Sequence, residues 1–272
     1  MFSTNPRNLA SERYFYEFKE LGEDELLFVN DFIGRAREAE LQAFNKDWLN
    51  LFQMPFQVRS FLSSKPPEDP RRVEVEDKLL VIQKTLAEDL HAAYENGAVE
   101  MLRNLKEQVD TDWRDPERRG EFLFFLALQY VRTLKHKNAI GGLEVPAHFD
   151  LKSLWSVMQF IFASNIAYGL FSKHEKYNLT FLRNQTEIRF IAGDQPIVNL
   201  NVSDDPDLKL FYPLSPSLAL LLSPSDEIES KYVDVSEIVA EGYNYLMFCK
   251  SEAQVFGADN VYLEGLIKLP KM

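Results

Sequence analysis

Hydrophobic positions in the first part of the chain recur with the three-to-four-residue spacing of a helix. From Glu23 onward the apolar positions are Leu26, Val29, Ile33, Ala36, Leu41, Phe44, Trp48 and Phe52. This period predicts helical structure over 23–52. Pro55 interrupts the pattern, and the polar, proline-rich stretch 63–70 is the clearest predicted loop in the chain.

Further apolar segments continue the helical pattern. A second long helix is predicted over 73–94, and Asn96-Gly97 supplies its C-terminal stop. A third segment covers 98–109, and the run 121–134 is almost wholly apolar on the way to Arg132. All of these segments point to a helical first two-thirds of the chain.

The most apolar segment, Leu151–Phe171, is nearly long enough to span a bilayer. It carries Lys152, Gln159 and Asn165, however, and several serines. We therefore interpret it as a buried core helix with Asp150 as its N-cap, and we expect no association with membranes.

The hydrophobic period changes after about residue 176. Residues 179–182 and 186–191 alternate on either side of 183–185, which predicts a β-hairpin. A second strand pair, 208–212 and 217–222, is predicted around the Pro-Leu-Ser-Pro stretch 213–216. Asp234-Val235-Ser236-Glu237 has the form of a capping box and predicts a helix that begins there.

Together these patterns predict an α+β fold: a helical bundle of about five helices, followed by a small antiparallel sheet and a C-terminal helix. The expected organisation is a helical region, 1–175, and a β-rich region, 176–272, with the helix at about 235–249. We expect the two regions to form one compact domain.

Composition and charge narrow the classes of function. The formal net charge of −12 on 272 residues repels a phosphate backbone, so we expect no general nucleic-acid binding. Two short basic sets, Arg71-Arg72 and Arg114/Arg118/Arg119, are interpreted as solvated charges, because neither is interleaved with aromatic residues. The N-terminus has no apolar signal core, which predicts a cytoplasmic location.

Cysteine and histidine offer no catalytic or metal-binding pattern. Cys249 is the single cysteine, no Cys/His set has the spacing of a zinc site, and no phosphate loop or nucleophile motif is present. We therefore predict no bound metal and no cofactor.

One candidate site lies on the apolar run 121–134. Gln129 and Arg132 are three residues apart and so share a helix face, and Thr133 follows them. An amide and a guanidinium in an apolar run need partners, and arginine is suited to bidentate recognition of carboxylate or phosphate. The alternative is a buried arginine that holds an internal acidic residue or a loop.

The second candidate is Asp194, in the turn Gly193-Asp194-Gln195-Pro196 at the end of a predicted strand. A carboxylate there could belong to an active site. It could equally stabilise the bend as an Asx turn, in which aspartate accepts a hydrogen bond from the backbone two residues on.

Three stretches resemble a bacterial domain-of-unknown-function family, number 4238. Gln129–Thr133 matches its Gln-x-x-Arg-Thr element, and Pro213–Pro216 matches its Pro-Leu-Ser-Pro stretch. Phe190–Pro196 corresponds to its Phe-Ile-Thr-Ser-Asp-Asn-Pro turn, altered here to Ala192-Gly193 and Gln195. The family's usual His-Tyr-x-Pro element does not precede the first long helix; were its histidine catalytic, this chain would be an inactive or incomplete version.

The resemblance implies candidate positions and no reaction, so three functions stay open. The first is a binding or regulatory protein that acts on a protein partner, for example of a stress or phage-defence locus. The second is a metal-dependent hydrolase, acting on phosphoesters or nuclease-like, with Asp194 and another acid holding a divalent metal while Arg132 stabilises negative charge. The third is a sensor that grips a small anionic ligand with Gln129, Arg132 and Thr133.

Overall fold

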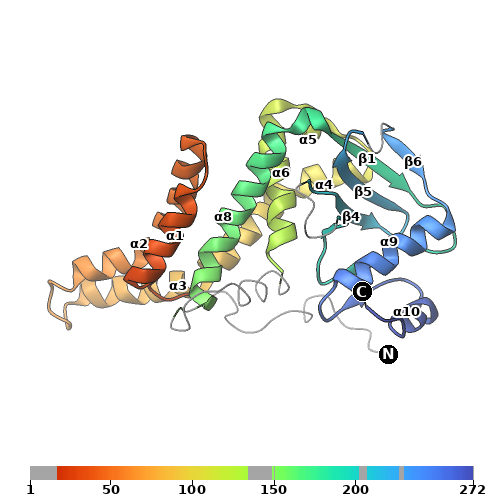
Figure 1. Cartoon of the computed structure of the whole chain (residues 1–272). Coiled ribbons are helices and arrows are strands. Elements are labelled where there is room, and N and C mark those ends of the chain that lie inside the picture. Colours follow the sequence, from red (N-terminus) through yellow and green to blue (C-terminus); the bar gives the residue numbers. More distant parts are fainter. Residues whose placement is uncertain (1–16, 134–148, 150, 202–206, 227–229, 272) are drawn as a thin grey trace. The chain divides into compact units, whose positions relative to one another are not determined.

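The structure, a computed structural model, describes residues 17–133, 149, 151–201, 207–226 and 230–271. The chain divides into two compact units: unit 1 comprises 1–96 and 143–161, and unit 2 comprises 97–142 and 162–272. Unit 1 is helical where it is described, whereas unit 2 combines helices with the strands (Figure 1). The fold is therefore α+β, as the sequence predicted.

Unit 1 contains α1 (Glu23–Gly34), α2 (Ala39–Leu62), α3 (Pro70–Gly97) and the first half of α8 (Leu151–Ser172). The predicted helix over 23–52 is thus two helices with a break at 35–38. α1 begins with a backbone-capping contact, in which the Glu25 carboxylate accepts the N–H of Gly22 at 2.8 Å. A local cap of this kind fixes where a helix starts.

An aromatic cluster forms the core of unit 1. Trp48 stacks on Phe160 of α8 with ring centroids 4.8 Å apart, and Phe52 lies 5.6 Å from the same ring. Phe18, just before α1, packs edge-on against Phe52 at 5.0 Å. Leu41, Trp48 and Phe52 of the predicted apolar period are therefore buried on α2, whereas Phe44 is 46% exposed.

Pro55 does not end a helix, which corrects the sequence prediction. It lies inside α2, where it is buried between the buried aromatic residues Phe52 and Phe56. A proline inside a helix removes one backbone hydrogen bond. Burial of the flanking aromatic side chains offsets that loss, because each contributes on the order of 2 kcal/mol.

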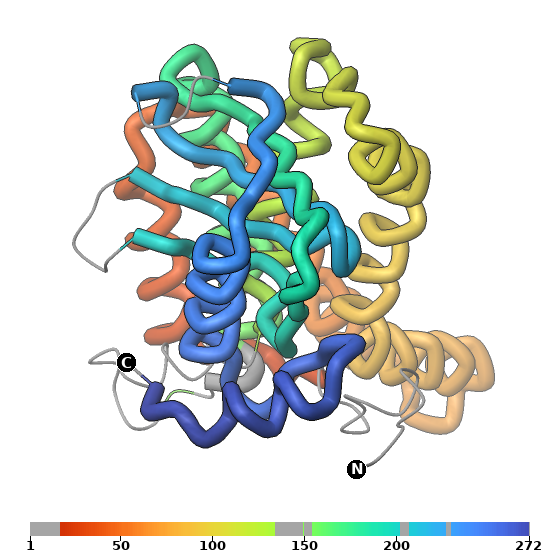
Figure 2. Tube along the Cα trace, turned by 90° about the vertical axis from the view of Figure 1, so that its right-hand side faces the viewer, coloured from red at the N-terminus to blue at the C-terminus, as the bar shows by residue number. Residues whose placement is uncertain are grey.

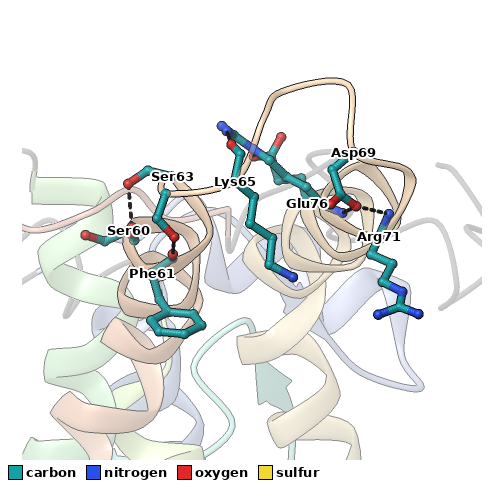
Figure 3. Close-up of polar contacts among 9 residues, drawn as sticks. Ser60, Phe61, Ser63, Lys65, Asp69, Arg71 and Glu76 are labelled. Atoms are coloured by element: carbon teal, nitrogen blue, oxygen red, sulfur yellow. Dashed lines mark hydrogen bonds and ion pairs between the residues drawn. The ribbon is translucent and has the colours of Figure 1, made fainter.

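The turn between α2 and α3 is the loop that the sequence predicted, and its own polar side chains close it (Figure 3). Ser63 donates its hydroxyl to the carbonyl of Ser60 at 2.6 Å, which caps the end of α2. At the start of α3, the carboxylate of Asp69 accepts the N–H of Arg71 at 2.8 Å. Each helix end therefore has a local side-chain partner for its otherwise unpaired backbone groups.

Unit 2 starts with α4 (Val99–Lys106), α5 (Thr111–Arg114) and α6 (Pro116–Val131), and it includes the second half of α8 and the short 3-10 helix η2 (His174–Lys176). Its five-stranded sheet has the order β3-β4-β5-β1-β6. The strands are β1 (Tyr177–Arg183), β3 (Val198–Asn199), β4 (Leu210–Ser215), β5 (Leu218–Pro224) and β6 (Tyr232–Asp234). β6 is parallel to β1 and the other pairings are antiparallel, so the sheet is mixed.

The predicted strand pair around 213–216 is confirmed as β4 and β5, but the predicted hairpin around 183–185 is wrong. β1 pairs with β5 and β6 instead of with 186–191. Asn184 is the physical reason: its side-chain amide donates to the carbonyl of Ile188 at 2.8 Å and accepts the N–H of Thr186 at 3.1 Å. The chain therefore closes a loop where alternation predicted a strand.

Two helices and a two-stranded sheet complete unit 2. α9 (Glu237–Lys250) lies across one face of the five-stranded sheet, and α10 (Asn260–Leu266) follows it (Figures 1 and 2). Met247 and Phe248 of α9 share a core with Phe211 and Leu221 of the sheet. β2 (Ala192–Gly193) pairs with β7 (Val255–Phe256).

The start of α9 also differs from the predicted capping box. Its N-cap is Ser236, because Asp234 belongs to β6. There Asp234 is held by a bidentate pair with Arg183 of the neighbouring strand β1, at 2.8 and 3.0 Å. The local pattern assigned the Asp234 side chain to the helix cap, but in the structure this side chain forms an ion pair with a residue far away in the chain.

Among the described helices, the segment Leu154–Ser172 of α8 is long and apolar enough to cross a membrane by length and composition alone. Yet 67% of its apolar window is buried inside the structure. That burial agrees with the interpretation as a core helix. The expected N-cap, Asp150, lies outside the described residues.

A buried polar pair in unit 1 gives a test of its packing. The amide oxygen of Gln159 lies 3.0 Å from Nε2 of His91, and both side chains are buried. We expect Gln159→Leu to lower the free energy of unfolding by about 1–3 kcal/mol, because it removes a hydrogen bond to a buried imidazole. Urea unfolding would measure the change. Gln57→Leu, at an exposed position of α2, is the matched control, and an equal loss there would contradict the expectation.

Candidate functional site

The side chain of Gln195 ties the end of α6 to the turn after β2. Its amide oxygen accepts the hydroxyl of Thr133 at 3.1 Å, and its amide nitrogen donates to the carbonyl of Tyr130 at 3.2 Å. Gln195 is 3% exposed, and Thr133 is also buried. The two stretches singled out in the sequence therefore do meet, but through Thr133 and Gln195.

Asp194 holds a different segment. Its carboxylate accepts three backbone N–H groups, from Glu252 at 2.9 Å, Ala253 at 2.7 Å and Gln254 at 3.1 Å. Its own N–H donates to the carbonyl of Gln254 at 3.0 Å. Residue 196 is proline and has no N–H to give, so the local Asx turn is replaced by this long-range anchor.

The remaining candidates lie on the last turn of α6. Gln129 is buried, and Arg132 is the partly exposed C-cap, whose N–H donates to the carbonyl of Leu128 at 3.0 Å. The carboxylate of Asp194, meanwhile, is engaged by the loop 252–254. The structure thus brings Thr133 to the Asp194 turn, while the contacts of Asp194 itself run to the segment between α9 and β7.

The third motif, Pro213–Pro216, packs against the Phe190–Pro196 stretch. The N–H of Phe190 donates to the carbonyl of Pro216 at 2.9 Å, and the ring of Phe190 meets Phe211 edge-on at 5.6 Å. Phe211 in turn stacks on Tyr243 of α9 at 4.6 Å. All three motifs therefore form one packed framework within unit 2.

Asn244 of α9 is a residue of this framework that sequence reasoning missed. Its amide oxygen accepts the N–H of Ile191 at 3.0 Å, and its amide nitrogen donates to the carbonyl of Arg189 at 2.8 Å and to the hydroxyl of Tyr262 at 3.1 Å. The side chain is completely buried. An asparagine between two tyrosines in an apolar helix was the only signal in the sequence.

Gly193 packs closely against the C-terminal end of α9. A Cβ atom at this position would sit 1.9 Å from the hydroxyl oxygen of Ser251, 3.1 Å from its Cβ and 3.3 Å from the sulfur of Met247. Ser251 itself donates its hydroxyl to the carbonyl of Met247 at 2.8 Å. Gly193 stands where the family's turn has a serine. Because glycine has no side chain, it leaves room for Ser251 at the end of α9.

Two hollows mark a different surface of unit 2. The larger has a volume of about 340 Å³ and is lined by Lys106, Gln108, Arg183, Asn184, Gln185, Ser215, Ser217 and Leu218. The smaller, of about 200 Å³, is lined by Asp110, Trp113, Arg114, Asn178, Leu179, Ser230 and Lys231. Lys106 and Gln108 flank the larger hollow and Asp110 the smaller, so the α4–α5 segment runs past both.

We call this surface the basic face, defined by Lys106, Arg114, Arg183 and Lys231. Tyr232, 38% exposed, lies among them, with the guanidinium of Arg183 and the ammonium of Lys231 at 5.4 and 5.2 Å from its ring centroid. Cation–π attraction holds both cations at the ring.

Asp110 organises the smaller hollow. It accepts from Arg114 at 2.6 Å and from Lys231 at 2.9 Å. Burial alone would raise the pKa of this carboxyl, but the hydrogen bonds from Lys231 and Arg114 outweigh it and lower the pKa below its usual value. The same contact with Asp110 raises the pKa of the Lys231 ammonium, against a smaller opposing effect of burial. Both charges are therefore maintained at neutral pH.

The other arginines near the basic face are structural. Arg118 pairs with Asp112 at 2.6 Å. Arg119 is buried and donates to the carbonyls of Trp113 and Arg114 at 2.7 and 3.0 Å, so the expectation of a solvated charge is wrong for this residue. It faces inward because backbone carbonyls of the α5–α6 turn supply the acceptors it needs. Among the described residues, no group of three or more His, Cys, Asp or Glu side chains is placed to hold a metal ion.

Comparison with known proteins agrees with the resemblance seen in the motifs. The profile of the family described as "Protein of unknown function (DUF4238)" matches residues 1–260. The chain therefore belongs to this family. No curated protein and no solved structure matches it.

The role of Asp194 as an anchor is testable by unfolding. We expect Asp194→Ala to lower the free energy of unfolding by about 1–3 kcal/mol, because three backbone N–H groups lose a charged acceptor. Asp226→Ala, at an exposed acidic position of the same unit, is the control and should change stability by less than about 0.5 kcal/mol. Equal melting temperatures for the two variants would contradict the anchor.

The close packing at Gly193 makes a second prediction. Gly193→Ala should cost about 1–3 kcal/mol, because its methyl group overlaps Ser251. In a Ser251→Gly background the same change should cost clearly less, since both atoms of the Ser251 side chain that crowd the methyl group are gone. A double-mutant cycle by chemical denaturation measures this coupling, and strict additivity would disprove the contact.

Proposed function

We propose that this protein acts by binding, and that the basic face of unit 2 recognises an anionic group on its ligand. The proposal makes it a regulatory or sensory protein of the bacterial cytoplasm, with a stress or phage-defence locus as the expected setting. Family membership supplies no activity, so the support comes from the described surface.

The observation that carries the proposal is a local reversal of charge. Among the residues described as lining the two hollows, four are basic, Lys106, Arg114, Arg183 and Lys231, and one, Asp110, is acidic. The chain as a whole has a net charge of −12. A positive patch on an acidic protein attracts anions selectively to that patch.

The geometry of the face suits binding. Asp234 pairs with Arg183, and Asp110 pairs with both Arg114 and Lys231, so three of the four cations are fixed before any ligand arrives. Fixing donors in advance reduces the entropy lost on binding. The exposed ring of Tyr232 adds an apolar surface between them.

The two alternatives have less support. Metal-dependent hydrolysis needs a carboxylate free to bind the metal, whereas the Asp194 carboxylate accepts three backbone N–H groups. A sensor built on Gln129, Arg132 and Thr133 needs polar groups that can reach a ligand, whereas Gln129 and Thr133 are buried and the Thr133 hydroxyl already donates to Gln195.

Thermal unfolding tests the proposal. We expect at least one of inorganic phosphate, glycerol phosphate and citrate to raise the melting temperature of the full chain. A ligand at a hundred times its dissociation constant adds about 2.7 kcal/mol, which corresponds to a rise of several degrees. Lys106→Glu, a charge reversal at an exposed position of the basic face, should abolish the rise.

Lys268→Glu makes the same charge change at an exposed position just beyond α10, and the rise should survive in it. If no anion stabilises the wild type, or if both variants respond like the wild type, the basic face does not bind anions.

A further inference from the structure

We infer that the larger hollow of the basic face, which we call the serine groove, binds the phosphate group of a small phosphate monoester. This inference rests on the proposed function and narrows it to one hollow and one class of ligand. It begins with the β4–β5 turn, which carries Ser215 and Ser217.

The two serines place their hydroxyls side by side at the groove. Their Oγ atoms lie 3.4 Å apart, and the N–H of Ser217 donates to Oγ of Ser215 at 3.3 Å. Ser217 is exposed and Ser215 partly so. Adjacent hydroxyls at the tip of a tight turn offer two donors to one ligand group without any backbone movement.

Two cations flank these hydroxyls. Lys106, at the end of α4, is exposed, and no described residue forms an ion pair with it. Arg183 pairs with Asp234 through Nε and Nη2, which leaves the two N–H groups of Nη1 outside that pair. The pair fixes the guanidinium plane, so Arg183 presents its remaining donors in a set orientation, while the ammonium of Lys106 is exposed beside them.

Gln108 adds an independent observation. Its φ is 60°, the left-handed region, and it is the one non-glycine residue there in the part of the chain that the structure describes. Such a conformation costs energy for a side-chain-bearing residue, and strain of this kind concentrates at functional sites. Here it places a glutamine in the wall of the groove, while its carbonyl accepts the hydroxyl of Tyr232 at 3.4 Å.

Charge and donor count favour phosphate over carboxylate. The groove lining carries two positive charges and no acid, and its donors are two hydroxyls, an ammonium, a guanidinium and side-chain amides. A phosphate monoester carries about −1.5 to −2 charges and three strong acceptor oxygens. A carboxylate has one charge and two oxygens, so it would leave part of this donor set unused.

The volume of about 340 Å³ lies at the small end of the range for small-molecule sites. The groove therefore accommodates a compact monoester in which the phosphate is the main recognition element. Free inorganic phosphate shares this chemistry, and the experiment separates the two sources.

Isothermal titration calorimetry on the full chain tests the inference with three probes: glycerol phosphate, inorganic phosphate and citrate. We expect glycerol phosphate to bind most tightly. Ser215→Ala and Ser217→Ala should each weaken it about tenfold, because each removes a hydrogen bond to a charged group without changing the net charge. Ser225→Ala, at a partly exposed position outside the lining of the groove, is the matched control.

The outcomes separate the groove from the basic face as a whole. If Lys106→Glu abolishes binding and both alanine variants bind like the wild type, the face binds anions but the serine groove is not the site. If citrate equals glycerol phosphate, the phosphate class is wrong. Equal binding of inorganic phosphate supports the groove and identifies free phosphate as the source.

A measurement on the wild type guards against variants that do not fold. Titration with glycerol phosphate should shift the backbone amide resonance of Ser217 in a nitrogen–proton correlation spectrum. Binding without a shift at Ser217 would overturn the serine groove. Failure of all three probes to bind would overturn the proposed function as well.

Discussion

The structure of unit 2 depends on how the segment 189–195 satisfies its backbone hydrogen bonds. None of it belongs to the five-stranded sheet, so its buried N–H and C=O groups need partners elsewhere, in the backbone or in side chains. Asn244 supplies them at Arg189 and Ile191. Gln195 and Asp194 then use their own side chains to hold α6 and the loop 252–254. Three polar side chains thus fix the positions of neighbouring elements, which apolar packing alone would not specify.

This arrangement changes the meaning of the family motifs. Polar residues in a short shared motif suggest chemistry, but Thr133, Asp194 and Gln195 are all engaged in holding the fold. Surface donors are found instead where the motifs end, at Ser215 on the β4–β5 turn. The framework and the basic face therefore share one element, and the framework determines where that turn lies.

Acidic residues orient the cations of the basic face. Asp110 and Asp234 each lie against cations that line a hollow, and they orient those cations while neutralising part of their charge. Lys106 has no such partner among the described residues. Ion pairs therefore hold three of the four cations of the basic face, and this arrangement suits the reversible anion binding that we propose.

The sequence by itself determined the elements whose cause is local. The apolar period of α2, the glycine stop of α3 and the β4–β5 pair around its prolines follow from residues within a few positions of one another. Only the tertiary structure decided the rest. Asn184 closes a loop where the alternating pattern predicted a hairpin. The partners of Gln195 and Asp194, and the backbone partners of Asn244, lie more than fifty residues away in the chain. The basic face likewise joins α4, α5, β1 and the residue before β6. The spacing of residues within one segment cannot predict a hydrogen bond or an ion pair between segments so far apart in the chain.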